Sequence, residues 1–345
     1  MALRLQPTSA EAHNNLGAVF LEQGKIPEAI DQFTKARDIN PNFAMTYYNI
    51  GNALNLQGKH EEAVSLFQRA IQLQPEYPDA HNNLGCLLML QGNVPEAVKH
   101  FEEAIRLRPD YVDALNNFGS VLIQLNRQQE AIPLLRKTIG LKPEYAEGHL
   151  NLGNALVGER EFREAIQEFS TAVRLKPDMV LAQYKLGNVL LLAGRIDEAA
   201  SHLQAALQLD PEFAEAHYQL GMAFGAAKRE SDALGHLREA ARLKPDWVEA
   251  INNLAWLLAT ARQPELRDGA RSLELARRAL ELSEAKDPGV LDTMAAAYAE
   301  TGEFTQAVET GEKAMQLAAE THADRLSNEI RGRIKLYQGK RPFRE

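Results

Sequence analysis

Apolar and small residues recur along this sequence at a fixed spacing of 34 residues. One slot of each unit holds a large apolar residue: Leu16, Ile50, Leu84, Phe118, Leu152, Leu186, Leu220 and Leu254. A small residue follows each of them: Gly17, Gly51, Gly85, Gly119, Gly153, Gly187, Gly221 and Ala255. A period of this length indicates a stack of similar supersecondary units, each of which buries its apolar face against its neighbours.

Each unit is predicted to contain two helices joined by a short turn. Alanines seven residues apart mark one face of the second helix, as Ala29 and Ala36 do in the first unit. A proline then ends the unit, because proline cannot continue a helix: Pro41, Pro75, Pro109, Pro143, Pro177, Pro211 and Pro245. Glycine fills the turn between the helices in several units, and Asn126, Arg160 or Lys228 fills it in others, where we expect a slightly different turn.

This pattern resembles the tetratricopeptide repeat (TPR) family, whose unit is two antiparallel helices of about 34 residues. The resemblance implies an all-α fold, a right-handed superhelical solenoid of about nine helical hairpins with a C-terminal capping helix. It also implies that the first helices line the concave side. Units begin near Ala10, Ala44, Pro78, Val112, Ala146, Val180, Ala214 and Val248, with a weaker ninth near Pro288.

The repeat divides the chain into four predicted parts. We assign residues 1–9 to the remnant of a preceding repeat, 10–287 to eight units, 288–318 to a ninth, and 319–345 to a capping helix and tail. In the eighth unit, residues 260–267 lengthen the turn between the helices, and the sequence leaves open whether this turn bends the stack or binds a partner.

Both ends of the array carry a readable pattern. Leu326, Ile330, Ile334 and Tyr337 recur at helical spacing among polar residues, as expected of a helix that covers the open end of a stack. At the other end, Ala2, Leu3, Leu5 and Pro7 match the last turn of a preceding repeat. We therefore expect the chain to be an excerpt from a longer protein, with an apolar N-terminal end that could pair with a second copy.

Amide side chains recur on the predicted concave face. The sixth residue of the units, which we call the ladder, is Asn15, Asn49, Asn83, Asn117, Asn151, Lys185, Gln219 and Asn253. An amide offers donors and an acceptor and can engage both groups of a peptide bond. The row resembles the asparagine ladder of O-linked N-acetylglucosamine transferases, where concave amides grip the main chain of client polypeptides. Lys185 and Gln219 depart from that ladder.

Other polar and aromatic residues flank the ladder. Asn52, Asn154 and Asn188 lie one turn further along, and Tyr48, Tyr184 and Tyr218 lie beside it. Tyrosine gives contact area at low entropy cost, so these groups favour peptide binding. The alternative is that the asparagines only hydrogen-bond a neighbouring helix. Acidic residues rim the same face and indicate either a basic or neutral client or favourable charges at helix N-termini: Glu11, Asp79, Asp113, Glu147, Glu215 and Glu249.

The candidates for chemistry are few. His13, His81, His149 and His217 recur every 68 residues, too far apart to share a metal ion, and we expect them to fill a packing slot. His202 and His236 lie in neighbouring second helices without further ligands. Cys86 is the only cysteine, and we expect it to be a small residue rather than a reactive thiol. With no nucleotide-binding or hydrolase motif in the sequence, we expect no enzyme activity and no cofactor.

Composition narrows the choice of partners. The net charge is −9 at pH 7, so no basic surplus is available to neutralise nucleic acid or anionic lipid. No apolar run is long enough for a membrane helix, and no signal peptide is present, so we expect a cytoplasmic protein. An extracytoplasmic domain of a larger membrane protein is the alternative.

The sequence thus predicts a scaffold that binds an unstructured peptide or a partner protein on its concave face. A second hypothesis is that the chain is the substrate-recruiting arm of a larger enzyme, such as a glycosyltransferase.

Overall fold

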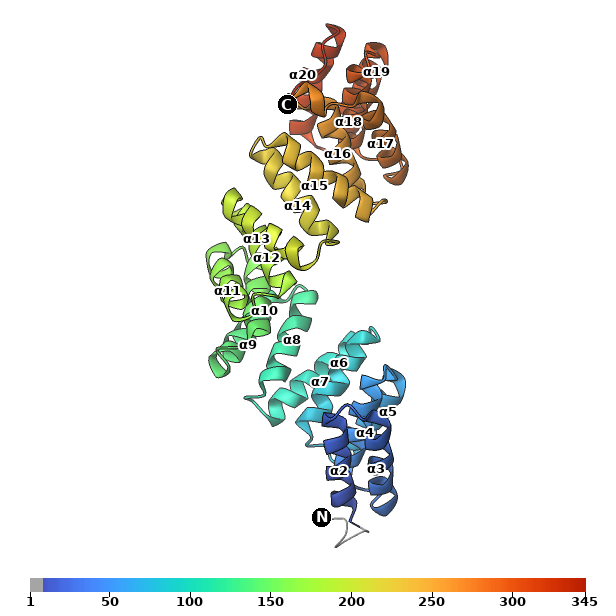
Figure 1. Cartoon of the computed structure of the whole chain (residues 1–345), viewed down its shortest axis with the longest axis vertical. Helices are drawn as coiled ribbons and strands as arrows, with labels where there is room; N and C mark the ends of the chain where they lie inside the picture. The colour runs from blue at the N-terminus through green and yellow to red at the C-terminus, as the bar shows by residue number, and fades with distance from the viewer. Residues whose placement is uncertain (1–8) are drawn as a thin grey trace. The chain divides into compact units, whose positions relative to one another are not determined.

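A computed structural model describes residues 9–345 of the chain, so Ala2, Leu3, Leu5 and Pro7 lie outside the described residues. Every regular element in the described part is helical, which confirms the predicted all-α repeat of hairpins. The helices follow one another as antiparallel pairs (Figure 1). They form two compact units, which divide between Leu175 and Lys176.

Unit 1 consists of five hairpins. Its first helices are α2 (Ala10–Glu22), α4 (Ala44–Leu56), α6 (Pro78–Leu90), α8 (Val112–Gln124) and α10 (Ala146–Gly158). Its second helices are α3 (Ile26–Ile39), α5 (His60–Leu73), α7 (Val94–Leu107), α9 (Gln128–Leu141) and α11 (Phe162–Leu175).

Unit 2 consists of four hairpins and a last helix. Its first helices are α12 (Val180–Leu192), α14 (Ala214–Ala226), α16 (Val248–Thr260) and α18 (Pro288–Glu300). Its second helices are α13 (Ile196–Leu209), α15 (Glu230–Leu243), α17 (Gly269–Leu282) and α19 (Phe304–Glu320). The last helix, α20 (Asp324–Gln338), packs against α19 and α18.

The recurring glycine brings the two helices of a hairpin together. A Cβ atom on Gly153 of α10 would lie 2.5 Å from the ring of Phe169 in α11, far inside van der Waals contact. A Cβ atom on Gly221 of α14 would likewise lie 2.8 Å from the Leu237 side chain of α15. Only a residue without a side chain leaves room for the large residue of the second helix, which explains the 34-residue period of the glycine.

The turns inside the hairpins share one backbone conformation. Gly24, Gly58, Gly92 and Gly194 have φ between 72° and 75°. Asn126, Arg160 and Lys228 occupy the same left-handed region, with φ of 56°, 63° and 60°. The expectation of a different turn at these three residues is therefore wrong. They adopt the glycine conformation at a backbone cost of about 1–2 kcal/mol each.

The lengthened turn of the eighth hairpin is an ordered element. Helix α16 ends at Thr260 and α17 begins only at Gly269, and the 3₁₀-helix η1 (Pro264–Leu266) lies between them. Here Ala255 replaces the recurring glycine. The buried Ser272 of α17 donates its hydroxyl to the Ala255 carbonyl at 2.7 Å, which links the two helices of this hairpin.

The first helices lie closer to one another than the second helices do. In unit 1, α2 contacts α4, and α8 contacts both α6 and α10. In unit 2, α12 contacts α14 and α16 contacts α18, and no two second helices of the described part are comparably close. In each unit the stack therefore curves toward its first helices. We call the side that carries the sixth and ninth residues of the first eight hairpins the first-helix face.

Candidate functional site

The ladder amides of unit 1 are turned toward the preceding hairpin. Asn49 Nδ2 donates to Asn14 Oδ1 at 3.0 Å. Asn117 Nδ2 donates to Asn82 Oδ1 at 3.1 Å, and Asn151 Nδ2 donates to Asn116 Oδ1 at 2.9 Å. The acceptors Asn14, Asn82 and Asn116 are buried. Each of these ladder residues therefore uses its amide donor to join two successive hairpins.

Two further ladder residues donate to tyrosine. Asn83 Nδ2 lies 3.3 Å from the Tyr48 hydroxyl and 2.9 Å from Asn52 Oδ1. In unit 2, Asn253 Nδ2 lies 2.9 Å from the Tyr218 hydroxyl. The tyrosines at the fifth position thus accept the same hydrogen bond that an asparagine accepts elsewhere.

The carbonyl ends of these amides are left for other partners. Within residues 9–345, no group donates to Oδ1 of Asn49, Asn117, Asn151 or Asn253. None of the four oxygens is a buried atom lacking a partner, so they remain accessible to solvent. Asn83 is the exception, because its Oδ1 accepts from Asn82 Nδ2 at 3.1 Å. The ladder therefore presents mainly acceptors at its surface.

The remaining ladder residues differ from this pattern. Asn15 is exposed, and its side chain makes no hydrogen bond to the described residues. Lys185 extends its ammonium over Tyr184, at 5.9 Å from the ring centroid. Gln219 is half-buried and makes no side-chain hydrogen bond in this part of the chain. The regular row of amide oxygens is thus a feature of unit 1, and unit 2 contributes Asn253.

The acceptor row behind the ladder was recognised in the sequence only at its tyrosines. It is the fifth residue of each hairpin: Asn14, Tyr48, Asn82, Asn116, Leu150, Tyr184, Tyr218 and Asn252. All but one carry an amide or a hydroxyl, at the same 34-residue period as the ladder. That alternation of acceptor and asparagine could have revealed the link between hairpins. It was hidden because the fifth residues look like ordinary surface residues of a helix.

The predicted tyrosines are held in the packing between hairpins. The ring centroid of Tyr184 lies 4.7 Å from that of Phe213, and that of Tyr218 lies 4.6 Å from that of Trp247. Tyr48 lies 5.0 Å from Tyr77 in the same way. Burial raises the pKa of Tyr48 and of Tyr218, so both phenols stay protonated. These rings are half-buried and pack beside the ladder.

The flanking asparagines have unequal surroundings. Asn52 Oδ1 accepts the bond from Asn83. Asn154 is half-buried and makes no side-chain hydrogen bond to the described residues. The Oδ1 atom of Asn188 is buried without a partner, an arrangement that normally costs stability unless a water or a ligand completes it.

The recurring histidines join the two helices of one hairpin. His81 Nδ1 lies 2.9 Å from His100 Nδ1, and His217 makes the same contact with His236 at 2.9 Å. His149 Nδ1 lies 2.6 Å from Glu168 Oε2. They are therefore polar links as well as packing groups. In the described residues no cluster of three or more His, Cys, Asp or Glu could hold a metal ion.

Cys86 lies in the middle of the ladder. Asn117 Nδ2 is 3.4 Å from its Sγ atom. Burial is the main cause that raises the pKa of this thiol to about 11, so it is protonated and weakly nucleophilic at neutral pH. The thiol is partly exposed on the first-helix face.

With this geometry established, comparison with known proteins identifies the repeat. Family models described as the tetratricopeptide repeat match residues 10–43, 42–110, 76–144, 150–212 and 190–258. The chain belongs to the tetratricopeptide repeat family. No curated protein matches the sequence.

Several solved structures resemble this TPR array. The crystal structure of YrrB, a TPR protein with an unusual peptide-binding site, is 26% identical, with a TM-score of 0.46 over 53% of this chain and 95% of that one. Pseudomonas aeruginosa pilF is 22% identical, with a TM-score of 0.54 over 59% and 92%. The APC/C hetero-tetramer Cut9-Hcn1 is 16% identical, with a TM-score of 0.58 over 84% and 56%. The last two show a shared fold.

The acidic rim of the TPR array is partly neutralised. Arg108 forms a two-pronged ion pair with Asp79, with a shortest distance of 2.7 Å, and Lys244 pairs with Glu215. Three other rim carboxylates are exposed and form no ion pair with a described residue: Glu11, Asp113 and Glu249. No helix in residues 9–345 is long and apolar enough to cross a membrane.

Proposed function

We propose that the first-helix face of unit 1 binds an extended polypeptide segment, and that the ladder oxygens accept hydrogen bonds from its backbone N–H groups. The observation that carries this proposal is that the nitrogen and the oxygen of each amide have different surroundings. Nδ2 of Asn49, Asn117 and Asn151 is engaged with the preceding hairpin, while Oδ1 of each is accessible and has no donor in the described residues. Because the donor end of each amide is used inside the stack, its oxygen is the end that is left for a client.

The spacing of the array suits an extended chain. Packed helices lie about 8–10 Å apart, and an extended chain in the polyproline II conformation advances about 3.1 Å per residue with three residues per turn. One ladder oxygen therefore meets about every third backbone N–H of a bound segment on the same side of that segment. Contacts of this kind read the backbone and not its side chains, so we expect micromolar affinity with little sequence selectivity.

Charge favours a particular class of client. Glu11 and Asp113 stand one helical turn before Asn15 and Asn117, and neither pairs with a described cation. A client with basic residues near its contact with the ladder gains from these carboxylates. The ladder itself carries no titratable group other than Lys185, so the proposed role is binding without catalysis.

Two substitutions of the same asparagines test the proposal. We replace Asn117 and Asn151 together by alanine, which removes both ends of each amide, or by aspartate, which removes the donor and keeps an acceptor. Binding of fluorescent unstructured peptides, followed by anisotropy, is expected to weaken at least tenfold in the alanine variant. The aspartate variant is expected to keep it.

Helicity and thermal unfolding of both variants serve as the controls. Both variants lose the bonds to Asn82 and Asn116, and aspartate also places a charge beside these two acceptors, so the stability of each variant is measured separately. The proposal fails if the alanine variant, still folded, binds as the original chain does. It also fails if both variants lose binding equally, since the loss would then follow the donor and not the acceptor.

A further inference from the structure

The last residues of the chain fold back onto the eighth hairpin. The backbone N–H of Glu345 donates to the Thr260 carbonyl at 3.1 Å. The indole Nε1 of Trp256 donates to Glu345 Oε2 at 2.9 Å, and Arg262 Nε donates to the Glu345 carbonyl. Residues 341–345, which we call the 341–345 segment, carry no helix, so they contribute these contacts as a peptide ligand would.

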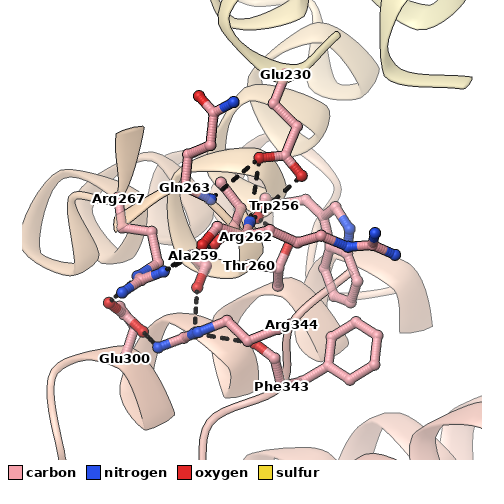
Figure 2. Close-up of polar contacts among 11 residues, drawn as sticks. Glu230, Trp256, Ala259, Thr260, Arg262, Gln263, Arg267, Glu300, Phe343 and Arg344 are labelled. Atoms are coloured by element: carbon pink, nitrogen blue, oxygen red, sulfur yellow. Dashed lines mark hydrogen bonds and ion pairs between the residues drawn. The ribbon is translucent and has the colours of Figure 1, made fainter. Parts of the chain in front are cut away.

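Arg344 and Phe343 anchor the same segment (Figure 2). Arg344 donates to the Ala259 carbonyl at 3.2 Å and forms an ion pair with Glu300 at 2.6 Å. The ring centroids of Phe343 and Trp256 are 5.8 Å apart. The guanidinium of Arg333 lies 4.9 Å from the Trp256 ring and 5.2 Å from the Phe343 ring. The segment thus places an aromatic ring against Trp256, a guanidinium against Glu300 and a carboxylate against the Trp256 indole N–H.

The receiving surface is built by the lengthened turn. The buried Glu230 accepts from the backbone N–H groups of Arg262 at 3.1 Å and Gln263 at 3.3 Å, as Figure 2 shows. Arg267 donates to the Ala261 carbonyl at 3.0 Å and to Glu300 at 2.9 Å. None of these bonds involves the 341–345 segment, so they hold the lengthened turn independently of it.

The helix end explains why this surface attracts a ligand. The last carbonyls of a helix have no partner inside it and carry partial negative charge. At the end of α16, the carbonyls of Ala259 and Thr260 receive the Arg344 guanidinium and the Glu345 N–H. A guanidinium at a helix C-terminus is also favoured by the helix dipole.

The site lies directly beside the ladder. Trp256 is the ninth residue of its hairpin, the slot that Cys86 and Met222 occupy where they contact a ladder amide. It follows Asn253, the last ladder residue, by three positions on the same helix. A peptide that runs along the first-helix face of unit 2 past Asn253 meets the 341–345 segment.

We propose that Trp256, the lengthened turn and Glu300 form a binding site for an extended segment carrying Phe, Arg and an acidic residue in sequence, and that the 341–345 segment occupies this site and shields the first-helix face of unit 2 beside Asn253. Helix α20 buries Ile330, Ile334 and Tyr337 in the core of unit 2. The 341–345 segment has one aromatic anchor, Phe343, so we expect it to detach when that ring is removed. The site stands on its own contacts in unit 2, whereas the proposed function concerns unit 1, so the two proposals are independent.

Trp256 provides the readout. The chain has two tryptophans, so Trp247→Phe leaves Trp256 as the only emitter. In that background we expect Phe343→Ala and Arg344→Ala each to raise acrylamide quenching of Trp256 severalfold and to shift its emission to the red. Arg341→Ala is the matched control, because the Arg341 side chain is exposed and makes no hydrogen bond or ion pair with the described residues. Unchanged quenching in both test variants would overturn the proposal.

A second measurement supplies the ligand from outside. A synthetic peptide of residues 339–345 is added to the Phe343→Ala chain, and we expect it to restore the original Trp256 emission with saturation. A peptide with alanine in place of its phenylalanine should not. Absence of any effect of the first peptide would show that the contacts do not form a binding site. No client peptide enters either test, so failure of the ladder proposal leaves these results interpretable.

Discussion

At the scale of single residues, one side chain serves both structure and the proposed binding. The amide of Asn117 donates to Asn82 and leaves its oxygen accessible, so the sequence hypotheses of a peptide ladder and of a structural link are compatible. The row of asparagines was readable from the sequence because it repeats. The sequence could not show that the amide nitrogen is hydrogen-bonded while the oxygen is accessible. That difference depends on the side-chain rotamer and on a neighbour 35 residues away.

Asn15 offers a natural control for the structural half of this role. Asn117→Ala leaves the buried Asn82 Oδ1 without its partner, so we expect the free energy of unfolding to fall by about 1–2 kcal/mol. Asn15→Ala removes no hydrogen bond of the described part and improves helix propensity, so stability should stay the same or rise slightly. Urea unfolding followed by circular dichroism measures both. Equal losses at the two sites would contradict the account.

The histidine pairs predict a dependence of stability on pH. Burial, and then the neighbouring histidine, lowers the pKa of His100 and of His236. The unfolded chain then binds more protons than the folded chain just below the usual histidine pKa of about 6.5, so these residues make stability fall as pH drops through that range. His149 acts in the opposite sense, because its hydrogen bond to Glu168 raises its pKa. The stability that His149 contributes is lost as the pH rises through this raised pKa.

Replacing His100 and His236 by glutamine isolates this effect. Glutamine reproduces the pairing of His13 with Gln32, so the hairpins keep a hydrogen bond at this position. We expect the urea midpoint to fall less between pH 7.5 and 5.5 in the double variant than in the original chain. If the original chain and the variant lose stability in parallel, the pairs do not titrate as described.

At the scale of elements, each of the first seven hairpins closes by fitting a large residue of its second helix against a glycine of its first. The ninth hairpin breaks this rule, because Ala295 and Gly311 are both small. There α20 supplies the large residue: a Cβ atom on Gly311 would lie 2.9 Å from Ile334. The sequence predicted the capping face of α20 from its apolar period. It could not predict this substitution of one helix for another, which requires knowing where α20 lies.

Two glycines of one hairpin should respond oppositely to alanine. In Gly221→Ala the new methyl group meets Leu237, so we expect a loss of about 1–3 kcal/mol from overpacking. In Gly235→Ala nothing lies within 4 Å of the new atom, and the higher helix propensity of alanine should add about 1 kcal/mol. Thermal unfolding of the two variants decides the point, and a loss of equal size in both would argue against the close approach.

The cap should be testable through Ile334. Ile334→Ala leaves a cavity against Gly311, so we expect a destabilisation of about 2–5 kcal/mol. Lys335→Ala changes an exposed residue of the same helix and should have little effect. Chemical unfolding measures both. A small effect of Ile334→Ala would mean that α20 is not part of the core of unit 2.

At the scale of the whole molecule, a 34-residue period fixes the fold almost completely, because every hairpin repeats the same contacts with its neighbours. The parts that depart from the period escaped sequence reasoning. The lengthened turn showed only as extra residues, and its contacts with Glu345 join positions 83 and more residues apart, which no local pattern encodes. The two features that break the repeat are thus the ones that the structure brings together.

The central claim is that a client lies along the first-helix face, and the only cysteine of the chain tests it directly. Cys86 is partly exposed on that face beside Asn117. The rate at which iodoacetamide alkylates Cys86 at mildly alkaline pH is measured with and without a saturating concentration of a peptide that binds the chain. The control is a Cys86→Ser chain with Ser65→Cys, whose cysteine is exposed on the second helix α5.

We predict that the peptide slows alkylation of Cys86 at least fivefold and leaves the control cysteine unaffected. A peptide that binds the chain while Cys86 reacts at its original rate would contradict the account, because the client would then lie away from the first-helix face.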